Sequence, residues 1–109
     1  MKNNYALITG ASSGIGLESS KYIASKGINL ILTARRGDVL ANISRQISEE
    51  YNVNVDFFPC DLSDQDAPVR IYDYCESKNY EVSLLVNNAG YGIPTSFHET
   101  SMEEEEKFI

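Results

Sequence analysis

The feature that most constrains this chain is the stretch of residues 5–16, YALITGASSGIG. A short apolar run ends at Thr9, and three glycines follow within seven residues, at Gly10, Gly14 and Gly16. Glycine adopts backbone conformations that other residues resist, and it leaves room where another group must approach closely. The apolar run is too short for a helix, whereas residues 14–26 have helical spacing. The pattern therefore predicts a tight turn from a strand into a helix.

The rest of the chain repeats this alternation of strand and helix. Residues 28–33, INLILT, are apolar almost throughout, which indicates a parallel strand covered on both faces. Gly27 stands where the preceding helix needs a residue with positive φ. Residues 88–99 are predicted to form a loop, and a further helix is predicted to start near Ser101. We expect strands at residues 5–9, 28–33, 53–58 (stopped by Pro59) and 82–87, and helices at residues 14–26, 38–51 and 66–78.

Strands that alternate with helices pair in parallel and are joined by right-handed crossovers. We therefore expect an α/β fold: a Rossmann-like doubly wound parallel sheet, truncated, with strand order 3-2-1-4. Such sheets bind ligands at the carboxyl ends of their strands, where the direction of the connections reverses. The glycines follow the first strand here, and residues 87–90, NNAG, follow the fourth. Both stretches are therefore predicted to lie at the ligand site.

The first glycine turn has the features of a pyrophosphate site. A helix N-terminus offers N–H groups and a favourable dipole to an anion. Gly10 is predicted to make the turn, Gly14 to leave space for a phosphate, and Gly16 to let the helix pack close to the strand. Ser12 and Ser13 add hydroxyl donors. The alternative is an ordinary glycine-rich turn, and a Walker phosphate loop is excluded because no Gly-Lys-Ser/Thr follows.

The spacing TGASSGIG, residues 9–16, resembles that of the short-chain dehydrogenase/reductase family. Two further stretches support the resemblance, CDLSD at residues 60–64 and NNAG at residues 87–90. The resemblance covers the whole chain but only the N-terminal half of the family, so it implies one cofactor-binding part, residues 1–109, without the catalytic half. It implies these cofactor contacts: Gly10, Ser12, Ser13, Gly14, Ile15 and Gly16 at the pyrophosphate, Asp61 and Leu62 at the adenine, and Asn87, Ala89 and Gly90 along the fourth strand.

Two of these assignments have structural alternatives. Asp61 could serve only to cap the turn that follows it. Asn and Gly in residues 87–90 are also common turn residues. We expect Asn88 to act mainly as a bridge between strands, so it is ranked below Ala89 and Gly90.

The end of the second strand predicts the choice of nicotinamide cofactor. An NAD-binding unit places an acidic residue about 20 residues past the glycines, bonded to the ribose 2′-hydroxyl. This chain has LTARR there, with Ala34 at the expected acidic position and Arg35 and Arg36 following. A 2′-phosphate is repelled by a carboxylate and held by a guanidinium. We therefore predict NADP(H), bound first by Arg35 and second by Arg36; the alternative is that both are solvated loop charges.

No catalytic residue is predicted within the chain. The family uses a Tyr-x-x-x-Lys pair, aided by a Ser and an Asn, in its C-terminal half. Tyr22 with Lys26, and Tyr74 with Lys78, match the spacing but precede the fourth predicted strand, which is the wrong place. His98 is interpreted as a loop residue. The chain alone is therefore predicted to have no dehydrogenase activity.

Composition narrows the partners and the compartment. The net charge is −7 and the pI about 4.5, which argues against nonspecific binding to nucleic acid or to an anionic membrane. No apolar run approaches the ~18 residues of a membrane span. Cys60 and Cys75 have no metal-ligand spacing and are interpreted as buried thiols of a cytoplasmic protein. The fourth strand would be an apolar edge in a sheet that stops there, so we predict self-association into a homo-oligomer.

The sequence therefore favours the NADP(H)-binding portion of an oxidoreductase that interconverts carbonyl and alcohol groups of a small molecule. One alternative is a non-catalytic dinucleotide-binding half-domain that acts as a sensor or assembly module. A second alternative is a sugar-nucleotide or other extended relative. Such relatives tend to carry G-x-x-G-x-x-G, which this chain lacks.

Overall fold

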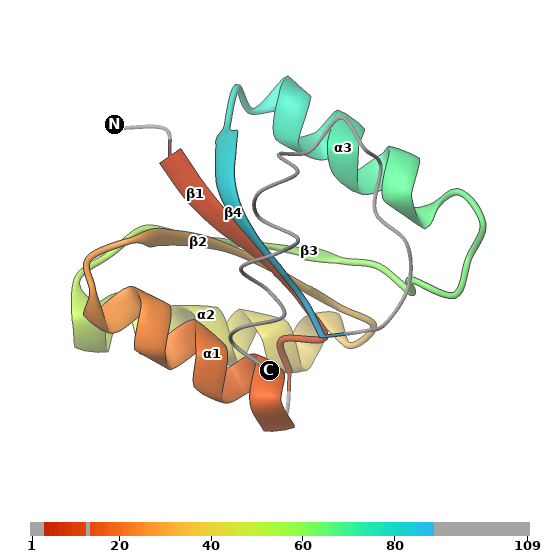
Figure 1. Cartoon of the computed structure of the whole chain (residues 1–109). Coiled ribbons are helices and arrows are strands. Elements are labelled where there is room, and N and C mark those ends of the chain that lie inside the picture. The colour runs from red at the N-terminus through yellow and green to blue at the C-terminus, as the bar shows by residue number, and fades with distance from the viewer. Residues whose placement is uncertain (1–3, 13, 89–109) are drawn as a thin grey trace.

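The computed structural model describes residues 4–12 and 14–88, which form a parallel sheet with helices on both faces (Figure 1). The strands have the order β3-β2-β1-β4, as predicted, and every pairing is parallel. In the register, Leu7 of β1 lies opposite Ile31 of β2 and Leu85 of β4. The elements are β1 (Asn4–Thr9), α1 (Gly14–Ser25), β2 (Asn29–Ala34), α2 (Gly37–Tyr51), β3 (Val55–Pro59), α3 (Ala67–Ser77) and β4 (Glu81–Asn87).

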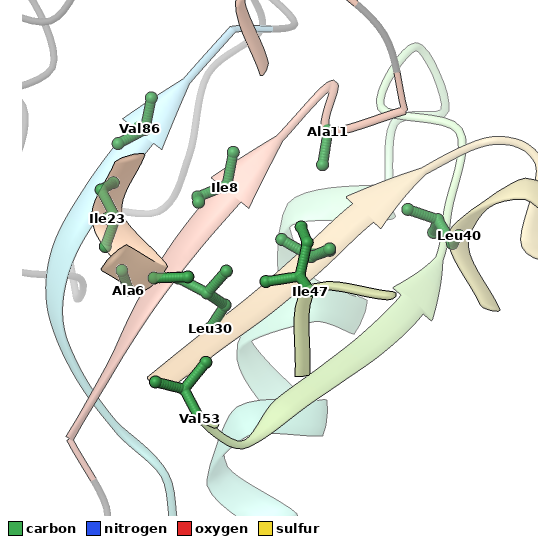
Figure 2. Packing of buried hydrophobic residues seen from close by; sticks show 11 residues of the cluster. Ala6, Ile8, Ala11, Ile23, Leu30, Leu40, Ile47, Val53 and Val86 are labelled. Atoms are coloured by element: carbon green, nitrogen blue, oxygen red, sulfur yellow. The ribbon is translucent and has the colours of Figure 1, made fainter. Parts of the chain in front are cut away.

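One face of the sheet packs against α1 and α2. Alternate strand residues point to this face, because successive side chains of a strand lie on opposite sides. Ile8, Leu30 and Val86 meet Ile23 of α1 and Ile47 of α2 in an aliphatic cluster (Figure 2). This cluster explains the helical spacing of apolar residues in both helices.

Among the described helices, α3 alone packs against the opposite face (Figure 1). Leu7, Ile31 and Leu85 from three strands meet Ile71 and Cys75 of that helix. Every residue from Leu30 to Thr33 is buried, so β2 is covered on both faces, as its apolar run predicts. Among the helices of residues 4–12 and 14–88, none has the length and apolar character that crossing a bilayer requires.

The predicted boundaries hold within about two residues. The third strand ends at Pro59, where it was predicted to stop, but the proline itself belongs to β3 and lies opposite Ala34. Because β3 is an edge strand, a proline without an N–H group breaks no ladder hydrogen bond there. Gly27 has φ +82° after α1, as predicted. The predicted loop at residues 88–99 lies beyond the described residues except for Asn88, and the predicted helix near Ser101 lies outside them.

Candidate functional site

A pocket of about 380 Å³ opens where β1, β2 and β3 end. Because the three strands are parallel, their carboxyl ends meet at one edge of the sheet, as the ligand-site prediction requires. Five of its lining residues were predicted to bind the cofactor, namely Gly10, Ser12, Arg35, Asp61 and Leu62. Its full lining is Gly10, Ser12, Ala34, Arg35, Cys60, Asp61, Leu62 and Ser63.

The glycine turn brings the start of α1 against the end of β1. Gly10 has φ +60°, the left-handed conformation that favours glycine. A Cβ on Gly16 would overlap the backbone carbonyl oxygen of Gly10, so only glycine permits this close approach. Ala11 N–H then donates to the Thr33 carbonyl oxygen at 3.2 Å, which ties the turn to β2. The predicted roles of Gly10 and Gly16 are therefore confirmed as backbone roles.

The remaining residues of the turn lie at the beginning of α1. Gly14 has φ +60° and nothing within 4 Å of an added Cβ, so its conformation favours glycine and the space beside it is open. The Ile15 side chain is 55% exposed. Ser12 lines the pocket, whereas Ser13 lies outside the described residues. The first turn of α1 therefore presents backbone and an open surface next to the pocket.

The two arginines after β2 have different surroundings. Arg35 lines the pocket. Arg36 donates from Nη2 and Nε to the Asp38 carboxylate, at 3.0 and 3.3 Å, and both side chains are exposed. The Arg36 donors lower the pKa of Asp38, and the carboxylate in turn raises the pKa of Arg36. Arg35 is therefore the better placed of the two, which agrees with the predicted ranking.

Ala34 also lines the pocket, at the position where NAD-binding units carry an acid. It is the last residue of β2, and its carbonyl oxygen accepts the Cys60 N–H at 2.8 Å. The lining of the described pocket contains one carboxylate, that of Asp61, which follows β3. The end of β2 therefore offers an arginine and no acid to a ligand.

The Asp61 carboxylate is held by Ser63. Oδ1 accepts the Ser63 N–H at 3.0 Å and the Ser63 hydroxyl at 2.7 Å. These two donors lower the pKa of Asp61, and the positive charge of Arg35 lowers it further. Asp61 thus does cap the turn, as the structural alternative proposed, and it also lines the pocket. Leu62 also lines the pocket, and it belongs to the buried cluster between the sheet and α3.

At the end of β4, the bridging role belongs to a different asparagine from the one predicted. The Thr9 hydroxyl donates to Asn87 Oδ1 at 2.8 Å, so Asn87 joins β4 to β1 and is buried. The bridge was predicted at Asn88, whose Nδ2 is buried without a partner in the described part of the chain. The difference follows from strand alternation, which turns Asn87 and Thr9 toward the same face. Ala89 and Gly90 lie outside the described residues, so their predicted contacts stay predictions.

Three residues of this region were not predicted from the sequence. Thr9 anchors Asn87, and Cys60 and Ser63 line the pocket. Burial raises the pKa of the Cys60 thiol. The Asp-x-Ser spacing of residues 61–63 is typical of a side chain that caps its own turn, and that signal could have identified Ser63.

The tyrosine–lysine pairs dismissed in the sequence do not line the pocket. Lys26 Nζ lies 5.2 Å from the centre of the Tyr22 ring, and Lys78 Nζ lies 5.6 Å from that of Tyr74. In each pair, the tyrosine lies in a helix and the lysine directly follows the end of that helix. Among the described residues, no group of three or more His, Cys, Asp or Glu is arranged to hold a metal ion. His98 lies outside those residues.

Comparison with known proteins decides which family this architecture represents. The family described as short chain dehydrogenase matches residues 4–109. The chain belongs to the short-chain dehydrogenase/reductase family. Its glycine turn and strand order are therefore those of a short-chain dehydrogenase/reductase fold, present here in part.

Two curated relatives illustrate the similarity. The chain is 39% identical over 100 residues to a fatty acyl-CoA reductase of Acinetobacter baylyi, covering 92% of this chain and 34% of that protein. It is 36% identical over 110 residues to a very-long-chain 3-oxoacyl-CoA reductase of Candida glabrata, covering 97% of this chain and 31% of that protein. The chain thus spans about a third of the length of these curated relatives.

Solved structures of the family include proteins with NADPH bound. L-Sorbose reductase from Gluconobacter frateurii, in complex with NADPH and L-sorbose, matches with a TM-score of 0.74 and 30% identity, over 95% of this chain and 41% of that one. A short-chain dehydrogenase from Sphingobium yanoikuyae in complex with NADPH matches with a TM-score of 0.72 and 27% identity, over 96% of this chain and 42% of that one.

Proposed function

We propose that this chain is the NADP(H)-binding portion of an oxidoreductase that interconverts a carbonyl and an alcohol in a small molecule. The observation that carries the choice of cofactor is Arg35 at the pocket, directly after Ala34 and without an acid at the end of β2. A guanidinium forms charge-assisted hydrogen bonds with a 2′-phosphate, which a carboxylate at Ala34 would repel. The NADPH complexes of two similar proteins support the proposal.

The described residues fit a dinucleotide. Gly16 and Gly10 form a corner in which a side chain would collide with backbone, and the N-terminus of α1 begins beside it. An anion is stabilised at such a terminus by N–H groups and the helix dipole. Gly10, Ser12, Gly14, Ile15 and Gly16 would hold the pyrophosphate, with Ser13 as a further predicted donor. Arg35, and to a smaller extent Arg36, would hold the 2′-phosphate, and Asp61 and Leu62 the adenine.

Binding and orientation are the contribution of these residues to the reaction. The cofactor, when bound, supplies the hydride chemistry. We assign no described residue to proton transfer, and we predict no dehydrogenase activity for the chain by itself. The activity toward a small carbonyl or alcohol is proposed for the complete protein, as are the predicted contacts of Asn87, Ala89 and Gly90.

Self-association remains a proposal with its own physical reason. β4 lies at one edge of the described sheet, and its apolar residues Val82 and Leu84 are only partly buried. Exposed apolar edges pair with other chains. Light scattering over a range of concentrations should show a homo-oligomer, and a monomer at the highest concentration would contradict the proposal. The cytoplasmic location also remains a prediction.

Amide NMR titration of the chain with NADP, and separately with NAD, tests the cofactor proposal. We expect the amide signals of residues 10–16 and of Arg35 to shift at a lower concentration of NADP than of NAD. In the variant Ala34→Asp, the added carboxylate should weaken NADP binding and erode or reverse the preference. An unchanged ratio of NADP to NAD affinity in that variant would show that the end of β2 does not select the cofactor.

A further inference from the structure

The Asp61 carboxylate is restrained through only one of its two oxygens. Both Ser63 donors, the N–H and the hydroxyl, reach Oδ1, at 3.0 and 2.7 Å. Within the described part of the chain, Oδ2 accepts no hydrogen bond. Two donors on one oxygen fix the plane of the carboxylate as well as its position. Oδ2 is therefore a defined acceptor that the turn itself does not use.

The surroundings make this acceptor available to a ligand. Asp61 and Ser63 both line the pocket, and Arg35 lines it too. The carboxylate is ionised at neutral pH, since Ser63 and then Arg35 lower the pKa of Asp61. An ionised carboxylate accepts hydrogen bonds and cannot donate them. A ligand that meets Oδ2 must therefore present a donor.

We propose that Ser63 is a positioning residue that makes Asp61 select a 6-aminopurine over a 6-oxopurine. The inference rests on the proposed function, because it concerns the base of the same dinucleotide. Adenine presents its exocyclic amino group as a donor, whereas hypoxanthine presents a carbonyl oxygen at that position. A site built to hydrogen-bond one group discriminates strongly against an analogue that lacks it, because its own polar group is then left without a partner. Ser63 contributes by holding Oδ2 in one place.

A purely structural role of Ser63 predicts a different result. The Asp64 N–H donates to the Asp61 carbonyl oxygen at 3.0 Å, so this segment is already a closed turn that leads toward α3. If Ser63 served only that turn, its loss would lower stability and leave the choice of base unchanged. Base selectivity is therefore the readout that separates the two roles.

The experiment compares NADP with its hypoxanthine analogue, nicotinamide hypoxanthine dinucleotide phosphate, by calorimetric titration of the chain. We expect the unaltered chain to prefer NADP by about tenfold or more. Ser63→Ala should reduce this ratio to about threefold or less while the ratio of NADP to NAD affinity stays the same. Ser63→Thr keeps the hydroxyl and should restore the selectivity. Ser77→Ala is the matched control, because the Ser77 hydroxyl donates to the Tyr74 carbonyl oxygen on α3, outside the pocket lining.

A second variant covers the case in which Ser63→Ala does not fold. Asp61→Asn keeps an acceptor for the Ser63 donors and puts an amide donor in place of Oδ2, so the preference should shift toward the hypoxanthine analogue. Unchanged base selectivity in folded Ser63→Ala, or no selectivity in the unaltered chain, would overturn the inference and leave NADP binding intact. Where Ser63→Ala does not fold, unchanged selectivity in Asp61→Asn would overturn it. Failure of the unaltered chain to bind either NADP or NAD would instead overturn the proposed function, and the inference with it.

Discussion

The polar groups at the two ends of the parallel sheet differ in the partners that they have within the protein. At the amino end, the Asp56 carboxylate of β3 accepts the hydroxyls of Tyr74 and Tyr80, at 2.8 and 2.6 Å, and the Phe57 N–H at 2.8 Å. The Tyr80 ring packs on Tyr5 with 4.1 Å between ring centres. The amino end thus joins β3, α3, β1 and the residue before β4 through groups that bind one another.

The carboxyl end leaves polar groups free for a ligand. Arg35 forms no ion pair within the described residues, and Oδ2 of Asp61 accepts no hydrogen bond there. We proposed that the carboxyl end binds the cofactor, and the contacts of Asp56 assign the amino end a role in stability. Mutations at the two ends should therefore separate stability from affinity.

The largest effect should come from a change at Gly16, because both the stability of the fold and the binding of the cofactor depend on this residue. Gly16→Ala places a Cβ on the backbone carbonyl of Gly10, and neither strand nor helix can yield without a shift of the main chain. We expect a loss of about 3 kcal/mol in the free energy of unfolding together with loss of NADP binding. Urea unfolding and NADP titration measure the two effects. Glu18→Ala, on the exposed side of the same helix, is the control and should change neither.

At the amino end, Asp56→Ala should lower stability without changing affinity. The variant removes a charged acceptor from three donors, which should reduce the free energy of unfolding by about 2–3 kcal/mol. The dissociation constant of NADP for the folded chain should stay the same. Asp73→Ala removes an exposed carboxylate of α3 and serves as the comparison. Weaker NADP binding by folded Asp56→Ala would show that the two ends are coupled.

At the carboxyl end, Arg35→Ala should weaken NADP binding without changing stability. Loss of a charge-assisted bond to the 2′-phosphate should weaken NADP binding about tenfold, which corresponds to about 1.4 kcal/mol, and leave NAD binding and urea unfolding unchanged. Arg36→Ala is the matched control. Its effect should be smaller, because Arg36 is engaged by Asp38. Equal losses from both variants would mean that the Arg36–Asp38 pair opens when the ligand binds.

The smallest effect should be a loss of stability at alkaline pH. Burial, and then the hydrogen bond to Asp56, raise the pKa of both Tyr74 and Tyr80 above the usual value near 10. The folded chain therefore holds these protons when the unfolded chain releases them. Stability from this source is complete below pH ~10 and falls as the pH rises further, by on the order of 1 kcal/mol at pH 10.5.

Unfolding free energies between pH 8 and 11 measure this dependence. The double variant Tyr74→Phe/Tyr80→Phe should be less stable at pH 8 and should lose less on going to pH 10.5. Equal slopes for the variant and the unaltered chain would contradict the assigned role of the Asp56 cluster.

Much of the fold and part of the site followed from local patterns. Short apolar runs and helical spacing predicted the seven described elements in order, and the glycine spacing predicted the corner at Gly10 and Gly16. Arg35 was predicted because the end of β2 is recognisable by counting from the glycines. These signals are local, so they do not require knowledge of which segments meet in space.

Other features were missed because they depend on segments that are distant in sequence. The inclusion of Pro59 in β3 depends on its pairing opposite Ala34 of β2, which no local pattern in residues 53–59 shows. The bridge from Thr9 was assigned to Asn88 rather than Asn87, which requires knowing which face each side chain shares. The contact of Asp56 with Tyr80 joins residues 24 positions apart and has no local signature.

The sequence by itself determined the order of strands and helices, the glycine corner and the absence of an acid at the end of β2, because backbone conformation and charge are properties of single short segments. Only the tertiary structure decided that Arg35, Asp61 and Ser63 line one pocket, and that Asp56 accepts hydrogen bonds from Tyr74 and Tyr80 at the amino end. Those relations depend on how parallel strands align and alternate their side chains across the sheet.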